Sequence, residues 1–180
     1  MNNIHLMRSF FSSRSQPPKR RWLRLVINLA VPLGFLLLLQ AWQGRATLRG
    51  LAPDIGGLTT SGQSLHLSDF RGGPVALHFW GSWCGVCRAE QPTIVAFSAN
   101  HPVVTVAAYS GSREEVASYL TEHPIGAPTL VDPSGTLARR FGVTSYPTTF
   151  VLDEEGRIQY TSLGFSSELG LRFRMWLAGL

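Results

Sequence analysis

The sequence of 180 residues contains only two cysteines, and its first 42 residues contain no acidic side chain. Six of the sixteen Lys and Arg residues lie in residues 1–42, whereas all eleven acids lie in residues 43–180. The formal charge of +5 therefore belongs to the N-terminal part, because bases and acids nearly cancel in the rest. A nucleic-acid-binding protein would spread its basic residues over a folded surface, so this distribution argues against that class.

The basic N-terminal part runs into a long apolar stretch. Residues 1–21 are predicted to be a basic cytoplasmic tail, in which Pro17–Pro18 stop any helix. Residues 22–42 would span about 31 Å as a helix, which predicts a single-pass transmembrane anchor in the inner membrane. A cleaved signal peptide ending at Ala46 is the alternative, although Arg45 does not suit such a cleavage site. In either case the remainder is expected outside the cytoplasm, in the periplasm of a bacterium, where disulfides persist.

The rest of the chain is predicted to be a linker, residues 43–52, followed by one globular domain, residues 53–180, and no internal repeat is visible. Turn residues at Ser61–Gly62 predict a β-hairpin near the start of the domain. Apolar runs then alternate with segments of helical spacing, which predicts an α/β fold with a mixed central sheet. Strands are expected over 75–80, 103–109 and 128–132, with two more in 148–164, and helices over 85–100, 112–123, 133–143 and 166–180.

Local signals also mark the ends of two of these helices. Ser112 and Glu115 have the spacing of a capping box, and Gly142 is expected to end its helix. The Leu, Phe, Met and Trp residues of the last helix are expected to pack in the core.

Cys84 and Cys87 are separated by two residues and follow a predicted buried strand directly. Cys84 would open the next helix, whose free N–H groups and partial positive charge stabilise a thiolate. Cys87, one turn along, can attack a mixed disulfide formed at Cys84 and release the substrate. We therefore expect an exposed first sulfur and a more buried second one.

Two other interpretations of the cysteine pair are weaker. A zinc site would need two further ligands, and the histidines of the predicted domain show no ligand spacing. A structural disulfide that closes so short a loop would add little stability. Redox chemistry without a metal is therefore the preferred interpretation.

The segment FWGSWCGVCRAEQP resembles the active-site segment of thioredoxin-fold proteins. Three markers carry the resemblance: Trp83 with the cysteine pair, the Arg88-x-Glu90-x-Pro92 pattern, and VTSYPTTFVLDEEGRI downstream. Together they resemble the membrane-anchored, periplasm-facing TlpA/ResA/DsbE-like group, and most closely the ScsD type found in copper-tolerance operons. The resemblance covers most of residues 53–180 and implies a thioredoxin fold with an N-terminal β-hairpin extension.

The resemblance implies further site residues around the cysteines. Tyr146-Pro147 would be the cis-proline of the fold, where the Tyr146 backbone can pair with an extended substrate strand. Trp83 flanks the site and would also contribute to substrate binding. Gly85 and Val86 stand where thioredoxin has Gly-Pro, and this pair would tune the reduction potential.

Cys87 must lose its proton before it attacks, so a base is expected nearby. His78 occupies the position of the buried acid of thioredoxin and is either a proton relay or a hydrogen-bonded core residue. Glu90, three residues after Cys87 on the same helix face, resembles an acid of the membrane-anchored group and is predicted to be catalytic. An ordinary solvated glutamate is the alternative.

These features predict a thiol–disulfide oxidoreductase that acts on protein thiols and disulfides through the Cys84–Cys87 pair, with no other cofactor. The resemblance favours a reductant, for cytochrome c maturation or thiol repair under metal stress, regenerated by a membrane electron-transfer partner of the DsbD/ScsB type. An oxidant or isomerase of secreted proteins is the alternative. A copper-binding module is a further class, although no histidine occurs after His123, and the Trp-Cys-x-x-Cys pattern argues against a thiol peroxidase.

Overall fold

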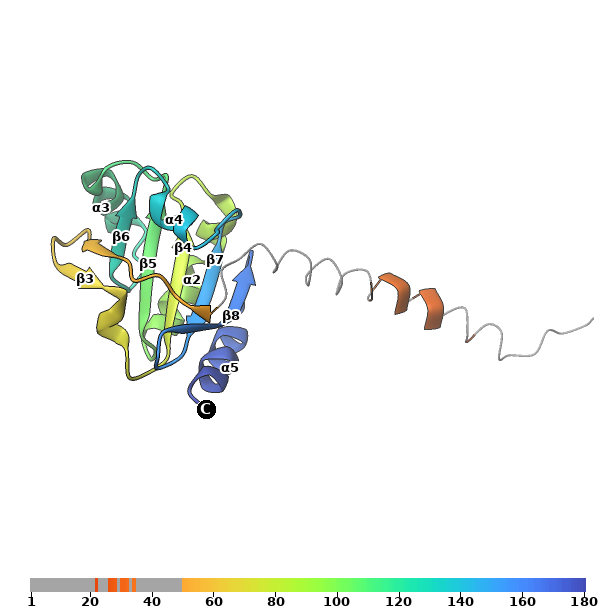
Figure 1. Ribbon diagram of the computed structural model, residues 1–180. Helices are drawn as coiled ribbons and strands as arrows, with labels where there is room; N and C mark the ends of the chain where they lie inside the picture. The colour runs from red at the N-terminus through yellow and green to blue at the C-terminus, as the bar shows by residue number, and fades with distance from the viewer. Residues whose placement is uncertain (1–21, 23–25, 29, 33, 35–49) are drawn as a thin grey trace, which may run out of the picture. The chain divides into compact units, whose positions relative to one another are not determined.

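The computed structural model describes Trp22, residues 26–28, 30–32 and 34, and residues 50–180 (Figure 1). The chain divides into two compact units, Met1–Gln40 and Ala41–Leu180, and the described residues of the first unit are helical. Within these described ranges, no helix has both the length and the apolar character needed to cross a membrane. The predicted tail and most of the predicted anchor lie outside the described residues.

The second unit contains a six-stranded mixed sheet in the order β1-β8-β7-β4-β5-β6. Its strands are β1 (Gly50–Leu51), β4 (Val75–Trp80), β5 (Val103–Ala108), β6 (Thr129–Asp132), β7 (Thr148–Leu152) and β8 (Arg157–Leu163). Strands β4, β5 and β6 run parallel, whereas β7, β8 and β1 each pair antiparallel. The predicted hairpin is confirmed as a separate antiparallel pair, β2 (Gly56–Leu58) and β3 (Ser64–His66).

The α-helices follow the predicted segments and stop signals, and one additional 3₁₀ turn was not predicted. The helical segments are the 3₁₀ turn η1 (Leu67–Phe70) and the α-helices α2 (Gly85–Ser98), α3 (Arg113–Glu122), α4 (Thr136–Arg140) and α5 (Glu168–Ala178). Ser112 and Glu115 form the predicted reciprocal capping box at the start of α3. Gly142 follows α4 with a φ of 65°, the left-handed conformation that terminates helices.

Strand β4 is buried along its whole length because the sheet is covered on both faces. Successive side chains point to opposite faces of a strand. Leu77 and Phe79 enter the core that contains residues of η1 and α4, whereas Ala76 and Trp80 enter the core formed with α2, α3 and α5. His78 lies between Ala76 and Trp80 and therefore on the α2 side of the sheet.

The sheet begins inside the stretch predicted to be a linker. Gly50 pairs with Ile158, and Leu51 pairs with Arg157, at the edge of the sheet. These pairs use backbone groups only, and both β1 residues are exposed. A two-residue edge strand of this kind has no apolar alternation, so the sequence contained no signal for it.

The last helix also departs from the prediction. Leu171 and Met175 of α5 are buried as expected, but Phe173 and Trp176 are exposed. The helical repeat places these two aromatic residues on the side of α5 that points away from the sheet. The expectation that all large apolar residues of this helix pack in the core is therefore wrong.

Candidate active site

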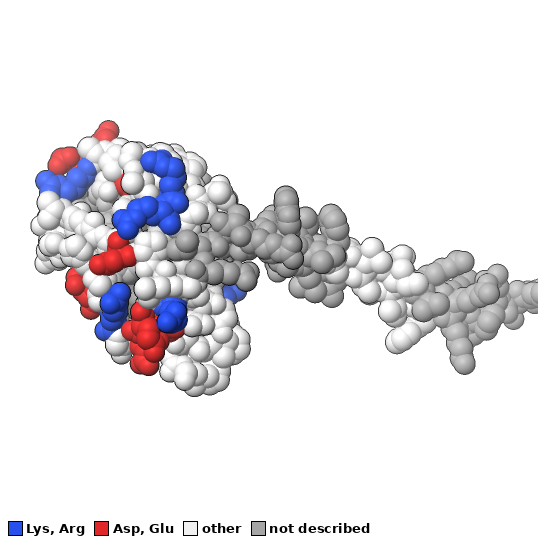
Figure 2. Space-filling view, in the orientation of Figure 1, with Lys and Arg blue, Asp and Glu red and all other residues white. Residues whose placement is uncertain are grey.

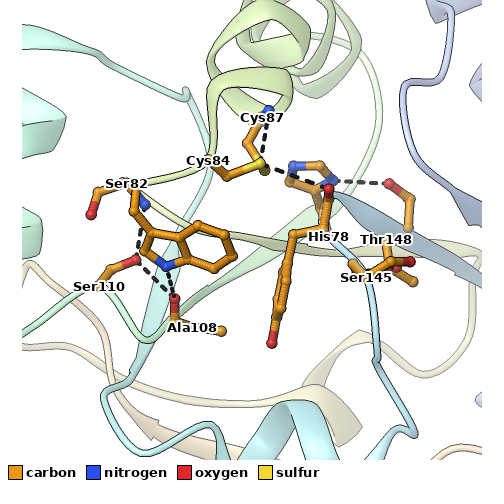
Figure 3. The surroundings of a disulfide bond; sticks show 11 residues. His78, Ser82, Cys84, Cys87, Ala108, Ser110, Ser145 and Thr148 are labelled. Carbon is orange, nitrogen blue, oxygen red and sulfur yellow. Dashed lines mark hydrogen bonds between the residues drawn. A yellow bond between two sulfur atoms is a disulfide. The ribbon is translucent and has the colours of Figure 1, made fainter.

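A disulfide joins Cys84 and Cys87 at the start of α2 (Figure 3). Residues 81–83 lead from the end of β4 to Cys84, which is the N-cap residue of the helix. The Cys84 sulfur accepts a hydrogen bond from the backbone N–H of Cys87, with an N···S distance of 3.1 Å. This N–H has no partner within the helix, so it can stabilise a Cys84 thiolate once the disulfide is reduced.

Both cysteines are buried in the disulfide form, with 7% of Cys84 and 5% of Cys87 exposed. The expectation of an exposed first sulfur is therefore wrong for this form. As an N-cap side chain, Cys84 turns back over the first helical turn, and its sulfur points to the loop before β7 rather than to solvent. Gly85 and Val86, between the cysteines, are exposed instead.

The loop before β7 lies against the disulfide. The Tyr146–Pro147 peptide bond is cis, as predicted. The carbonyl oxygen of Tyr146 lies 3.7 Å from the Cys84 sulfur. The Thr148 hydroxyl donates a hydrogen bond of 2.8 Å to the carbonyl of Ser145, which joins the two sides of the cis-proline turn (Figure 3). A backbone carbonyl is thereby held next to the sulfur that would bond to a substrate.

Three aromatic side chains gather next to this loop. Trp83 and Tyr109 each pack edge-on against Tyr146, with ring centroids 5.4 Å and 6.5 Å apart respectively. Both Trp83 and Tyr109 are exposed, so they present an apolar surface beside the disulfide. The Arg139 guanidinium donates a hydrogen bond of 3.2 Å to the Tyr109 hydroxyl.

Tyr109 was not predicted as a site residue. It follows β5 in the sequence, and it reaches the site because β5 pairs in parallel with β4, so both strands end on the same side. Its φ of 52° is uncommon for a residue other than glycine. No motif marks this position in the sequence.

Hydrogen bonds from the end of β5 hold the loop that precedes Cys84. The Ser110 hydroxyl accepts a bond of 3.0 Å from the N–H of Ser82 and donates one of 3.0 Å to the carbonyl of Ala108. The Trp83 indole N–H donates to the same carbonyl at 3.2 Å (Figure 3). These contacts fix the indole beside the disulfide, and sequence reasoning missed Ser110 because a lone serine carries no pattern.

Glu90 lies on the buried face of α2 together with Cys87 and Ile94. Its side chain is fully buried, so the alternative of a solvated glutamate is wrong. One carboxylate oxygen accepts a hydrogen bond of 2.7 Å from the N–H of Ser166, and the other, Oε2, has no hydrogen-bond partner in the described part of the chain. Burial raises the pKa of Glu90 from 4.5 to about 7, against the lowering effect of the Ser166 hydrogen bond.

His78 is also buried, on the same side of the sheet as α2. Its Nδ1 lies 2.9 Å from the hydroxyl oxygen of Thr149 on β7, the strand next to β4. Burial lowers the pKa of His78 to about 3, so the ring is neutral at physiological pH. Of the two interpretations made from the sequence, this environment matches the hydrogen-bonded core residue.

No three His, Cys, Asp or Glu side chains gather to form a metal site among the residues that the structure describes. The two cysteines are bonded to each other.

Known proteins resemble this chain in sequence and fold. The Redoxin family matches residues 49–170. A thioredoxin-like protein of Haemophilus influenzae is 35% identical over 126 residues, which cover 69% of this chain and 72% of that protein. The thiol:disulfide interchange protein DsbE of Xylella fastidiosa is 36% identical over 107 residues, or 56% of this chain and 53% of that protein. Among solved structures, the exposed lipoprotein thioredoxin of Streptococcus pneumoniae superposes with a TM-score of 0.63 and 30% identity, covering 69% of this chain and 98% of that one.

Proposed function

The chain belongs to the Redoxin family and is a thiol–disulfide oxidoreductase, and from this premise we propose that it reduces protein disulfides on the periplasmic side of a bacterial inner membrane. The observation that carries the proposal is the fully buried carboxyl of Glu90, one helical turn from Cys87, with a pKa of about 7. Such a group can take the proton that the second cysteine must lose during reduction of a substrate.

The first step joins the enzyme to its substrate. The Cys84 thiolate, stabilised by the Cys87 N–H and the start of α2, attacks one sulfur of a substrate disulfide. A bond forms between Cys84 and that sulfur, the substrate disulfide breaks, and the released substrate thiolate takes up a proton.

The second step releases the reduced substrate. Cys87 gives its proton to Glu90 and attacks the Cys84 sulfur, so the mixed disulfide breaks and the Cys84–Cys87 disulfide forms. The departing substrate thiolate takes up a proton, and two electrons have passed from the dithiol to the substrate. Glu90 has an oxygen free to receive the Cys87 proton, since Oε2 has no hydrogen-bond partner among the described residues.

The loop before β7 and the aromatic residues next to it would bind the substrate. The Tyr146 backbone, beside Pro147 and 3.7 Å from the Cys84 sulfur, is placed to pair with an extended chain. Trp83 and Tyr109 would contact apolar side chains next to the substrate cysteine. Gly85 and Val86 lie between the cysteines and would set the reduction potential through the stability of the Cys84 thiolate.

The proposed membrane location rests on the sequence, in which basic residues precede the apolar stretch 22–42. Each cycle leaves an oxidised Cys84–Cys87 pair, which a membrane dithiol donor of the DsbD/ScsB type would reduce again. Substrates would be the disulfides of cytochrome c precursors or disulfides formed under metal stress, the second being the role of an ScsD-type protein. No cofactor beyond the cysteine pair enters this cycle.

The reduction potential of the cysteine pair tests the proposed direction. The full chain, in mild detergent, would be equilibrated in dithiothreitol or glutathione buffers, and its free thiols would be counted by alkylation. We expect a potential near or below that of thioredoxin, about −270 mV. A Cys84→Ser chain, which cannot form the disulfide, gives the baseline. A potential near about −120 mV would identify an oxidant and contradict the proposal.

A further inference from the structure

Helix α5 is apolar on two opposite faces. Its inner face, which packs in the core, consists of Leu171, Met175 and Ala178. An outer stripe consists of Leu169, Phe173, Trp176 and, just beyond the helix, Leu180, with 59–85% of each residue exposed. At about 100° per residue, the helical members of the outer stripe fall within an arc of about 60°, opposite the inner face. An amphipathic helix on a soluble domain would carry polar residues there.

The surface around the outer stripe is also apolar. Phe173 and Trp176 stack with their ring centroids 6.0 Å apart. A groove of about 500 Å³ continues the stripe at Trp176 and runs between α5 and the residues before β4 and β5, where Pro74 and Pro102 line it. On the side of the domain that faces the viewer, the region that α5 occupies in Figure 1 is largely free of charged side chains (Figure 2).

The chain enters the domain at the end of the sheet that carries this groove. One row of backbone pairs crosses the sheet there and joins Gly50, Ile158, Leu152 and Val75 in that order. Three strand spacings of about 4.8 Å place Gly50 roughly 14 Å from Val75, the residue after the groove residue Pro74. The disulfide lies at the opposite end of β4, beyond Trp80.

Only seven residues, 43–49, separate the proposed anchor from Gly50. Fully extended, seven residues reach about 25 Å. If residues 22–42 span a membrane, Gly50 lies within about 25 Å of its surface, so the groove end of the sheet can reach the lipid.

We propose that the outer stripe of α5 and the adjoining groove lie against the surface of the lipid bilayer. This proposal rests on the membrane anchoring proposed above. Trp, Phe and Leu are the side chains with which interfacial helices enter the boundary between headgroups and acyl chains. Arg172 borders the stripe and lines the groove, where its guanidinium can reach lipid phosphates while its stem stays on apolar surface; Arg172 also pairs with Glu168 at 3.0 Å.

A second copy of the chain fits this surface less well than a bilayer does. The spacing of four and three residues in the stripe also occurs in coiled coils, but those need several heptads. Helix α5 has only 11 residues. Two such stripes packed together would also bring their flanking arginines near each other.

The proposed contact has a consequence for the redox site. Strand β4 has six residues, which span about 20 Å at about 3.3 Å per residue. The disulfide and the loop before β7 therefore lie about one strand length from the groove that would contact the lipid, where protein substrates can reach them.

Quenching of tryptophan fluorescence by brominated lipids tests the contact. The full chain would be reconstituted in phosphatidylcholine–phosphatidylglycerol vesicles, with acyl chains either unmodified or brominated. The difference in tryptophan emission between the unmodified chain and a Trp176→Phe chain is taken as the Trp176 signal. Trp83→Phe defines a matched control signal, because Trp83 is similarly exposed (57% against 61%) but lies at the disulfide end of β4. Far-UV circular dichroism and the urea midpoint of each variant check that the fold is intact.

We expect brominated lipid to remove most of the Trp176 signal and to leave the Trp83 signal unchanged. Equal Trp176 signals in the two lipids would overturn the proposal, and so would chemical cross-linking of two chains through α5. Flotation of the chain with the vesicles tests the membrane anchor separately. If the chain does not float with the vesicles, both the anchoring and the bilayer contact are contradicted. A reduction potential of the Cys84–Cys87 pair near that of an oxidant would contradict the proposed reductant role, but it would not contradict the lipid contact.

Discussion

Glu90 on α2 and His78 on β4 are both buried on the same side of the sheet, yet burial has opposite consequences for them. A low-dielectric environment disfavours the charged form of each group. It therefore raises the pKa of Glu90 to about 7 and lowers the pKa of His78 to about 3. Only Glu90 changes its protonation state near neutral pH, so only Glu90 is suited to proton transfer there.

The hydrogen bonds of the two side chains point to the same difference. His78 has a close partner in the Thr149 hydroxyl. Glu90 has one bonded oxygen and one buried oxygen without a partner among the described residues. Glu90 therefore has unused hydrogen-bonding capacity in a buried site, which makes it a candidate for function.

The largest expected effect is that of Glu90→Gln on activity. Glutamine keeps the size of the side chain and can keep the bond from Ser166, but it cannot accept a proton. We expect the rate of substrate reduction by the dithiol form to fall about 100-fold. In the unmodified chain, Glu90 must be ionised to accept the proton, so the rate should rise with pH through about 7; in the variant this inflection should be absent. Stopped-flow measurement of the reduction of a protein disulfide, repeated across pH, checks both.

Glu114→Gln is the matched control, because Glu114 is a fully exposed glutamate on α3. Its rate and pH profile should equal those of the unmodified chain. An inflection near pH 7 that persists in Glu90→Gln would show that another group takes the proton.

The next effect concerns stability. The folded-state pKa of Glu90 lies above its unfolded value of 4.5, so stability decreases as pH rises from 4.5 to about 7, and the full cost is present above that range. Glu90→Gln removes this cost and should raise the free energy of unfolding at pH 8 by about 1–3 kcal/mol. The gain should vanish below about pH 4.5. Urea unfolding of the full chain in mild detergent at the two pH values measures it, and a gain that does not change with pH would contradict the raised pKa.

The smallest effect is expected at His78. Thr149→Val removes the hydroxyl that pairs with Nδ1 and should lower the free energy of unfolding by about 1–2 kcal/mol. The reaction rate and its inflection near pH 7 should not change, because His78 stays neutral well below that pH. Thr121→Val is a suitable control, since the Thr121 hydroxyl is exposed on α3 and bonds only to a backbone carbonyl of its own helix. A displaced inflection in Thr149→Val would assign His78 a part in proton transfer.

The local features of the site could be predicted because each depends on neighbours in the chain. A buried strand followed by Cys-x-x-Cys indicated a helix start at Cys84 and a redox pair, and the Tyr146-Pro147 step indicated the cis bond. The spacing of Glu90 from Cys87 placed both on one helix face. Tyr109 escaped notice because its approach to Tyr146 depends on two strands whose order in the sheet is set by contacts distant in sequence.

The sequence by itself therefore determined the order of the strands from β2 to β8 and of the α-helices, the capping box of α3 and the chemistry of the cysteine pair. Periodicity, capping and X-Pro geometry act over a few residues, so they can be inferred without knowing the fold. Only the tertiary structure decided that both cysteines are buried, that Glu90 and His78 lose contact with water, and that one apolar face of α5 stays uncovered. Burial, and with it each pKa, depends on which surfaces meet, and that is settled by contacts between residues far apart in the chain.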